Sequence, residues 1–247
     1  SKASTALTDL QSLNTRLATL LGQAKKAAAP GGMQRFTATA SDASVTLAAG
    51  DGAAAGSIDL TVERVATSHA MVTAPMTTWP DTPPVLTVVR PDGSTTEISP
   101  ASDSLADVAR AVTNAGLGVT ATRVQAGTDA SGTPQYRLQF SSNETGAAAA
   151  FQIFRGDAAA VTAGTAIDLA AMPGAALVRE AQDAAVTLWP GTAAAQSVTS
   201  ASNVFTGLLP GVDVTVTKPL SEAVSLVVGP DLGGSADAAK AFLDQVK

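Results

Sequence analysis

Apolar residues recur at alternating steps of four and three near the start of the chain: Ala6, Leu10, Leu13, Leu17, Leu20, Ala24 and Ala27. This spacing is typical of a heptad seam and predicts a helix over about residues 5–27. The sequence Pro30-Gly31-Gly32 ends the helix, because proline lacks an amide donor and glycine frees the backbone. Two interpretations are open, a stripe that packs on its own domain's core and a seam that needs a partner helix. We favour the partner helix, because nothing adjacent in sequence could cover the stripe.

A second amphipathic pattern closes the chain. It follows a glycine-rich stretch over 229–234, and Ser235 is the predicted N-cap. Ala239, Phe242 and Val246 then fall on one face of the predicted helix. We therefore predict a helical assembly seam made by both ends of the chain; its members are Leu10, Leu13, Leu17, Leu20, Ala24, Phe242 and Val246.

The long middle of the chain has the pattern of β-strands. Runs rich in Thr, Val and Ile are separated by Gly, Pro, Asp and Ser, and several runs alternate apolar and polar residues. The predicted strands are Arg35–Thr39, Ser44–Leu47, Ser57–Val65, Val85–Arg90, Thr95–Ile98, Val119–Val124, Tyr136–Ser141, Ala150–Phe154, Ala185–Leu188, Gln196–Thr199, Val212–Thr217 and Val224–Val228. Alternation favours half-buried antiparallel strands, and Arg90–Ser94 has hairpin chemistry.

One helix interrupts these strands. Ser102 or Asp103 is its predicted cap, Leu105, Val108, Ala109 and Val112 line one face, and Asn114-Ala115-Gly116 ends it. The predicted fold is therefore multidomain α+β, with mainly antiparallel β head domains inserted between two helical leg segments at the chain ends. The expected domains are a helical leg (1–33 and 231–247), a middle β domain (34–78 and 176–230) and an outer α+β domain (79–175). Trp79 and Trp189 lie near the junctions, and we interpret them as packing anchors rather than stacking platforms for a ligand.

Composition excludes many kinds of chemistry. The 247 residues include no cysteine and a single histidine, so thiol nucleophiles, zinc fingers and His-ligated metal clusters are excluded. The net charge is −6 and the basic residues are scattered, which argues against nucleic-acid binding. No apolar run approaches the roughly 20 residues that span a bilayer. His69 has only the adjacent Ser68 as a candidate nucleophile, and neighbours on a strand point to opposite faces, so we expect His69 to be exposed or loosely packed.

No catalytic constellation, phosphate loop or calcium loop appears in the sequence. Carboxylate pairs can be drawn among 21 acidic residues, but none lies beside the aromatic run that a sugar cleft needs. We therefore predict a structural or interaction protein, with no enzymatic activity, cofactor or metal.

Four stretches carry a family resemblance. The first stretch, 55–69, has the alternation of a strand, and the second, 104–122, has a helix pattern followed by Ala-Gly and Gly-Val-Thr-Ala. The third stretch, 136–146, has a strand pattern followed by Glu-Thr-Gly. The fourth, 200–216, contains Ser-Asn, then Pro-Gly-Val, and then an alternating strand pattern. In this order the stretches resemble the bacterial flagellar filament-capping family, also called hook-associated protein two. Residues 104–146 resemble the flagellin-hook repeat of that family and lie in the expected outer domain.

The resemblance implies a structural cap at the distal tip of the flagellar filament, which promotes folding and insertion of exported flagellin and is needed for elongation. The implied partners are flagellin, further copies in a ring-shaped homo-oligomer, and the hook-associated junction proteins. The implied location is extracellular, after export through the flagellar channel without a cleaved signal peptide. We expect an internal fragment of such a protein, without its terminal coiled-coil regions. Host adhesion does not carry over, because the Ala-rich loops and both tryptophans depart from the family pattern.

Three alternatives stay open at this point. The first is another flagellar axial protein at the hook–filament junction, which would share helical ends and β heads. The second is a secreted adhesive or carbohydrate-binding β protein. The third is a structural module of a phage or pilus.

Overall fold

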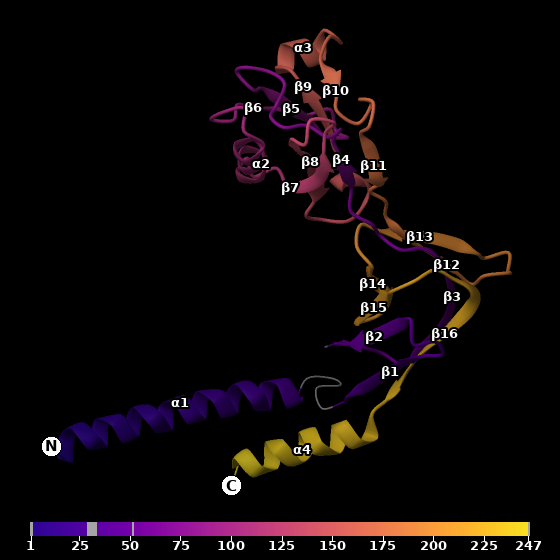
Figure 1. The fold of residues 1–247 in the computed structure, drawn as a ribbon. Coiled ribbons are helices and arrows are strands. Elements are labelled where there is room, and N and C mark those ends of the chain that lie inside the picture. The colour runs from indigo at the N-terminus through magenta and orange to yellow at the C-terminus, as the bar shows by residue number, and fades with distance from the viewer. Residues whose placement is uncertain (1, 29–33, 51, 247) are drawn as a thin grey trace. The chain divides into compact units, whose positions relative to one another are not determined.

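The structure is a computed structural model, and it describes residues 2–28, 34–50 and 52–246 (Figure 1). The α-helices of this part are α1 (Lys2–Ala28), α2 (Leu105–Asn114), α3 (Ala158–Thr162) and α4 (Leu232–Val246), with a short 3-10 turn at Ala147–Ala149. The strands are β1 (Phe36–Ala40), β2 (Val45–Ala49), β3 (Gly56–Arg64), β4 (Ala70–Val72), β5 (Leu86–Val89), β6 (Thr95–Ile98), β7 (Val119–Thr128), β8 (Pro134–Ser142), β9 (Gln152–Arg155), β10 (Ile167–Asp168), β11 (Ala176–Arg179), β12 (Ala184–Leu188), β13 (Gln196–Ser200), β14 (Val204–Leu209), β15 (Val212–Val216) and β16 (Leu220–Pro230).

The predicted α+β class with antiparallel sheets is confirmed. Each predicted strand overlaps a strand of the structure, and the β5–β6 hairpin turns through Gly93 at a φ of 81°. The prediction missed β4, β10, β11 and β14. The first three have at most four residues each, too few for alternation to distinguish them from loop.

The chain divides into two compact units. The first, the terminal unit, comprises residues 1–59, 206–214 and 224–247, and the second, the inserted unit, comprises 60–205 and 215–223. The chain passes from one unit to the other within β3, β14, β15 and β16. The two parts of the inserted unit therefore lie in the sequence between the three parts of the terminal unit.

In the terminal unit, β1 pairs with β16 antiparallel, with Phe36 opposite Pro230 and Ala40 opposite Leu226. The strands β14, β15 and β2 follow one another in a second sheet. The two-residue link between β14 and β15 is Pro210-Gly211, with Gly211 at a φ of 64°. Proline followed by a glycine at positive φ suits a tight turn, because proline presets its own φ and glycine has no Cβ.

The inserted unit holds two four-stranded sheets, in the orders β10-β9-β5-β6 and β11-β4-β8-β7. Helix α2 contacts β7, and the four apolar residues predicted to line its face are buried. The shared core also takes in the β-strands and the loops between them; its largest fully buried members are Trp79, Phe140, Met71, Leu86, Leu138, Ile153 and Leu169. Burial of Trp79 confirms its prediction as a packing anchor.

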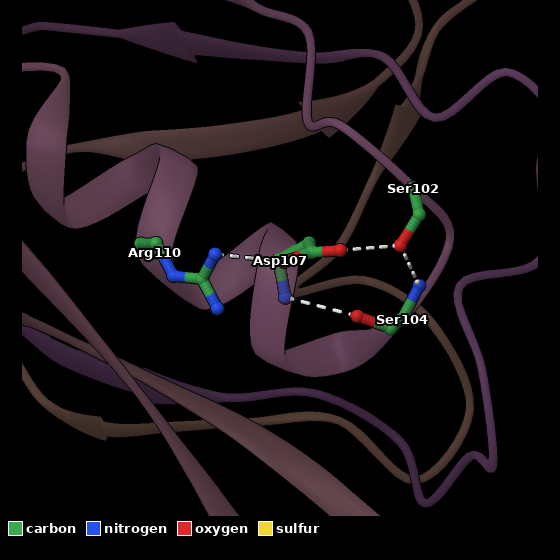
Figure 2. Close-up of polar contacts among 4 residues, drawn as sticks. All are labelled: Ser102, Ser104, Asp107 and Arg110. Carbon is green, nitrogen blue, oxygen red and sulfur yellow. Dashed lines mark hydrogen bonds and ion pairs between the residues drawn. The ribbon is translucent and has the colours of Figure 1, made fainter.

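Two serine side chains form hydrogen bonds with Asp107 in the first turn of α2 (Figure 2). The N-cap is Ser104, not Ser102 or Asp103 as predicted: its Oγ accepts a hydrogen bond from the Asp107 N–H at 3.1 Å. Ser102 instead donates its hydroxyl to the Asp107 carboxylate, and Arg110 lies 3.1 Å from the same carboxylate. Hydrogen bonds from Ser102 and then from Ser104 hold the pKa of Asp107 below its usual range, so an anion stands at the positive end of the helix dipole.

Candidate assembly surface on the helical ends

Helix α1 carries a row of exposed leucines. Leu10, Leu13 and Leu17 of the predicted seam are 63, 53 and 55% exposed, and Leu7 and Leu21 beside them are 59 and 57% exposed. At a rise of ~1.5 Å per residue the helix is about 40 Å long, so the row forms a long apolar stripe. Contiguous exposed apolar surface of this kind marks an interaction face, because a leucine gains roughly 1.5–3 kcal/mol on full burial.

The apolar stripe is less exposed to solvent toward the C-terminal end of α1. Leu20 and Ala24 are half-buried, in contrast to Leu10, Leu13 and Leu17. Helix α4 contacts α1 and lies beside the end of α1 that leads toward β1 (Figure 1). With 15 residues against 27, α4 is too short to cover the whole stripe. The leucines nearer the N-terminus are left for another partner.

Hydrogen bonds tie the start of α4 to the chain just before β1. The Asp231 N–H donates to the Arg35 carbonyl at 2.7 Å, and the Arg35 N–H donates to Ser235 Oγ at 2.9 Å. Together with the β1–β16 pairing, these bonds hold α4 at a fixed place in the terminal unit. These bonds therefore join α4 to the segment before β1, in addition to the contact between α4 and α1.

The predicted N-cap of α4 is wrong. The helix begins at Leu232, and Ser235 lies inside it. Asp231 precedes the helix and its carboxylate accepts a hydrogen bond from the Gly234 N–H at 2.8 Å, which is the work of a capping residue. The hydroxyl of Ser235 instead serves the Arg35 N–H.

The face of α1 opposite the seam is polar and self-contained. The Thr15 hydroxyl donates to the Gln11 carbonyl, and the Thr19 hydroxyl to the Thr15 carbonyl, each at 2.9 Å. Within the described residues, the ion pairs recorded lie in the inserted unit and none lies on α1. The hydroxyls of this face are bonded within the helix, and the apolar stripe is the face left for a partner.

The structure places the seven seam residues on two contacting helices, five on α1 and two on α4. The side chains of Phe242 and Val246 lie outside the described residues, so their share in the seam stays a prediction. Leu7 and Leu21 were not in the predicted set, although they are as exposed as Leu10, Leu13 and Leu17. Their spacing widens the stripe beyond a strict heptad seam.

Within the described residues, the buried Nδ1 of His69 has no hydrogen-bond partner. Its side chain is half-buried and packs edge-on against Phe151, with 4.5 Å between ring centroids, while its backbone N–H donates to Ser142 Oγ. Burial lowers the pKa of His69, and the Glu180 carboxylate opposes that shift. The expectation of an exposed or loosely packed ring is wrong, because the imidazole fills space beside Phe151.

Two further findings bear on the kind of site this chain can hold. Among the described side chains, no three acidic or histidine groups come together as metal ligands would. In the same part of the chain, no helix has both the length and the apolar character to cross a bilayer.

The prediction that Trp189 is a packing anchor is wrong. It is 43% exposed, so it is not a packing anchor like Trp79. The residue lies directly after β12, in the loop that leads to β13.

Comparison with known proteins finds a family model that is similar to the first part of the chain. Residues 1–69 match the model for the N-terminus of flagellar hook-associated protein 2. Comparison with curated protein sequences gives no match. The match covers 69 of the 247 residues, so it shows a likeness of this first part of the chain to that N-terminal region.

Solved structures extend the likeness to the rest of the fold. The D1-D2-D3 domains of the Escherichia coli flagellar cap protein FliD align over 97% of this chain and 69% of that one, with 20% identity and a TM-score of 0.72. The D2-D3 domains of the same protein align over 80% of this chain and 100% of that one, with 23% identity and a TM-score of 0.62. FliD (HAP2) from Pseudomonas aeruginosa PAO1 aligns over 82% and 91%, with 22% identity and a TM-score of 0.59. The chain has the fold of the flagellar cap proteins, and the predicted resemblance is confirmed.

Proposed function

We propose that this chain, which opens with the N-terminal region of the hook-associated protein 2 family, forms part of a structural cap at the outer tip of a bacterial flagellar filament. The cap promotes folding and insertion of exported flagellin and is needed for elongation of the filament. Its partners are flagellin, other copies of the same protein in a ring, and the hook-associated junction proteins. The cap works outside the cell, after export through the flagellar channel, and makes or breaks no covalent bond.

The observation that carries this proposal is the exposed leucine stripe on α1. Leu10, Leu13 and Leu17 are each more than half exposed, although a soluble helix ordinarily buries such a row. A cap has to hold its neighbours yet release them whenever a subunit inserts. Heptad contacts suit this task, because one helix can exchange partners in register without breaking its own backbone hydrogen bonds.

The division of labour follows the chain order. We propose a helical leg made by 1–33 and 231–247, a middle β domain made by 34–78 and 176–230, and an outer α+β domain made by 79–175. The leg carries the seam Leu10, Leu13, Leu17, Leu20, Ala24, Phe242 and Val246 and meets neighbouring helices. The β domains form the rigid wall of the cap, and their buried apolar cores support that role.

Replacing Leu13 and Leu17 together by aspartate tests the leg. Both side chains are exposed in the isolated chain, so the variant should fold, but two charges in an apolar seam should prevent helix docking. The assay is filament length by electron microscopy, with L13D/L17D carried by the native protein in a strain that lacks its cap. We expect flagellin to be shed into the medium and filaments to be short or absent.

The matched control is Q11D/T15D. Gln11 and Thr15 are exposed on the opposite face of α1, and the variant adds the same charge to the same two turns. We expect normal filaments from this control. Normal filaments from L13D/L17D, with circular dichroism showing a folded protein, would rule out the helical leg as the docking element.

A further inference from the structure

The segment that joins β3 to β4, residues 65–69, is hydrogen-bonded to other parts of the inserted unit. Thr67 and Gln182 form a two-way backbone bridge, in which each N–H donates to the other's carbonyl, at 3.0 and 3.2 Å. The Thr67 carbonyl also accepts from the Gly146 N–H at 3.2 Å, and the Thr67 hydroxyl donates to the Glu180 carbonyl at 2.6 Å. We call the three stretches that meet here, 65–69, 142–147 and 179–183, the junction.

His69 is the last residue of the first stretch, and its backbone is fixed on both sides. Its N–H donates to Ser142 Oγ at 2.8 Å, and its carbonyl accepts from the Ser142 N–H at 2.9 Å. Ser142 is itself buried. The neighbouring Ser68 carbonyl accepts from the Arg179 guanidinium at 2.7 Å. The ring of His69 therefore cannot move far from its place unless bonds of the junction break.

The imidazole of His69 is poorly placed to carry a charge. Its Nδ1 is buried and has no hydrogen-bond partner among the described residues. The ring packs edge-on against Phe151, which is 3% exposed and belongs to the core of the inserted unit. An imidazolium has a donor on each nitrogen, so protonation would leave a charged donor at Nδ1 without an acceptor. Because an unpaired buried charge costs more than an unpaired neutral atom, the site favours the neutral ring.

The charged residues around the ring do not remove this cost. They are Arg179, Glu180 and Asp183 in one stretch of the junction and Glu144 in another, whereas β4 and residues 149–153 carry no charge. The Arg179 guanidinium is bonded to backbone, and the Asp183 carboxylate accepts the Ala147 N–H at 2.7 Å. The Glu180 carboxylate favours the imidazolium, but burial outweighs it and lowers the pKa of His69.

We propose that protonation of His69 weakens the junction, so that the inserted unit opens there first when its surroundings become mildly acid. His69 is the single histidine of the chain, so no other side chain has an ordinary pKa in this range. Since the pKa of His69 is lowered in the folded state, stability is fully present above the ordinary value of 6.5 and is lost as the pH falls below it. This device goes beyond the proposed function and does not depend on it.

Tryptophan fluorescence in urea reports on the inserted unit alone, because Trp79 and Trp189 both lie in residues 60–205. For the 247-residue chain, the ratio of unfolded to folded inserted unit should rise by up to about tenfold between about pH 7.5 and about pH 5.5, which lowers the urea midpoint. His69→Phe keeps a ring beside Phe151 and removes the titrating group. The urea midpoint of H69F should therefore change little over the same range.

The matched control is H69F/Q125H. Gln125 is exposed on β7 of the same unit, so this variant keeps one histidine but places it in solvent. An exposed imidazole titrates alike in the folded and unfolded chain, and we expect the control to behave as H69F does.

Two measurements on the parent chain need no variant. A proton NMR titration of the single imidazole should give a pKa below 6.5 for the folded chain. Amide hydrogen exchange, corrected for the intrinsic effect of pH, should show where the unit opens. In mild acid, the N–H groups of Thr67 and Ser142 should lose protection by a larger factor than that of Val88, which is buried on β5.

Four results would overturn the inference. The first is a folded-state pKa of His69 at or above 6.5. The second is an equal shift of the urea midpoint in H69F and the parent chain, and the third is a return of the shift in H69F/Q125H. The fourth is an equal loss of protection at the junction and at Val88. If H69F does not fold, the titration and the exchange measurement on the parent chain decide.

Discussion

Gly211 is the position where a single methyl group should do most damage to the terminal unit. It sits in the two-residue turn between β14 and β15 at a φ of 64°. A Cβ added there would lie 2.4 Å from the Ala53 backbone nitrogen and 2.5 Å from the Gly52 carbonyl carbon. Both neighbours are backbone atoms, so no side-chain rotation can relieve the clash.

The expected cost of Gly211→Ala follows from three contributions. The left-handed conformation costs alanine ~1–2 kcal/mol. The Gly50 N–H donates to the Gly211 carbonyl at 2.8 Å, and loosening that bond costs about 0.5–1.5 kcal/mol. The displaced backbone of 52–53 adds to these two terms, which gives a total on the order of 2–4 kcal/mol. For a chain of this size, each kcal/mol lowers Tm by about 2–4 °C.

Gly207→Ala is the matched control, because Gly207 lies on β14 of the same unit at a φ of 80° with nothing within 4 Å of the added Cβ. It should show the conformational cost alone, ~1–2 kcal/mol. Thermal melting followed by circular dichroism measures both variants. Equal Tm values for G211A and G207A would refute the reasoning, because the clash with Ala53 would then carry no cost.

Three further changes probe the inserted unit. Leu138→Ala should lower the free energy of unfolding in urea by about 2–5 kcal/mol, because Leu138 is fully buried and its loss leaves a cavity; a loss below 1 kcal/mol would contradict this packing. Ser104→Ala should cost about 1 kcal/mol through loss of the α2 N-cap, and S104D, which can also cap, should restore most of it. Arg155 donates to both carboxylate oxygens of Asp81, at 2.8 and 2.6 Å, and its hydrogen bonds hold the pKa of Asp81 below its usual range. Arg155→Met should therefore cost on the order of 1 kcal/mol at neutral pH. The difference between the urea midpoints of R155M and the parent chain should begin to shrink as the pH falls below about 3.9, the ordinary pKa of an aspartate in the unfolded chain, and should be lost as the pH falls through the lowered pKa of the folded state. A difference that stays constant from neutral pH into acid would argue against the ion pair.

The sequence patterns that predicted structure correctly are those repeated over several residues. The heptad spacing of α1, the alternation in β3 and β15, and the apolar face of α2 each involve enough positions to outweigh a single exception. The start of α4 was misplaced because Gly233 and Gly234 have poor helix propensity, which pointed to a later start. Tertiary context overrode that preference: the chain is already fixed by the Arg35–Asp231 hydrogen bond, and Asp231 caps the helix.

The two tryptophans show why site prediction is harder than fold prediction. Both precede proline near an expected junction, so their local sequences give the same expectation. The difference arises from residues far along the chain: the core of the inserted unit encloses Trp79, whereas the loop after β12 leaves Trp189 exposed. The exposure of the α1 leucines was foreseeable, because no neighbouring segment could cover a heptad stripe. The exposure of Leu177 and Val178 on β11 was not, because the register of β11 shifts between Leu177 and Arg179, which no spacing rule predicts.

The pairing of β1 with β16 affects the order in which the two units can fold when the polypeptide emerges from its N-terminus. Arg35 and Ser235, which hydrogen-bond to each other, are 200 positions apart in the sequence. Strand β1 can therefore pair with β16 only after the residues between them have emerged. The inserted unit meets no such delay, since most of it is one continuous stretch that can collapse while later residues are still on their way. The terminal unit thus closes last, and its closing strand leads directly into the final helix.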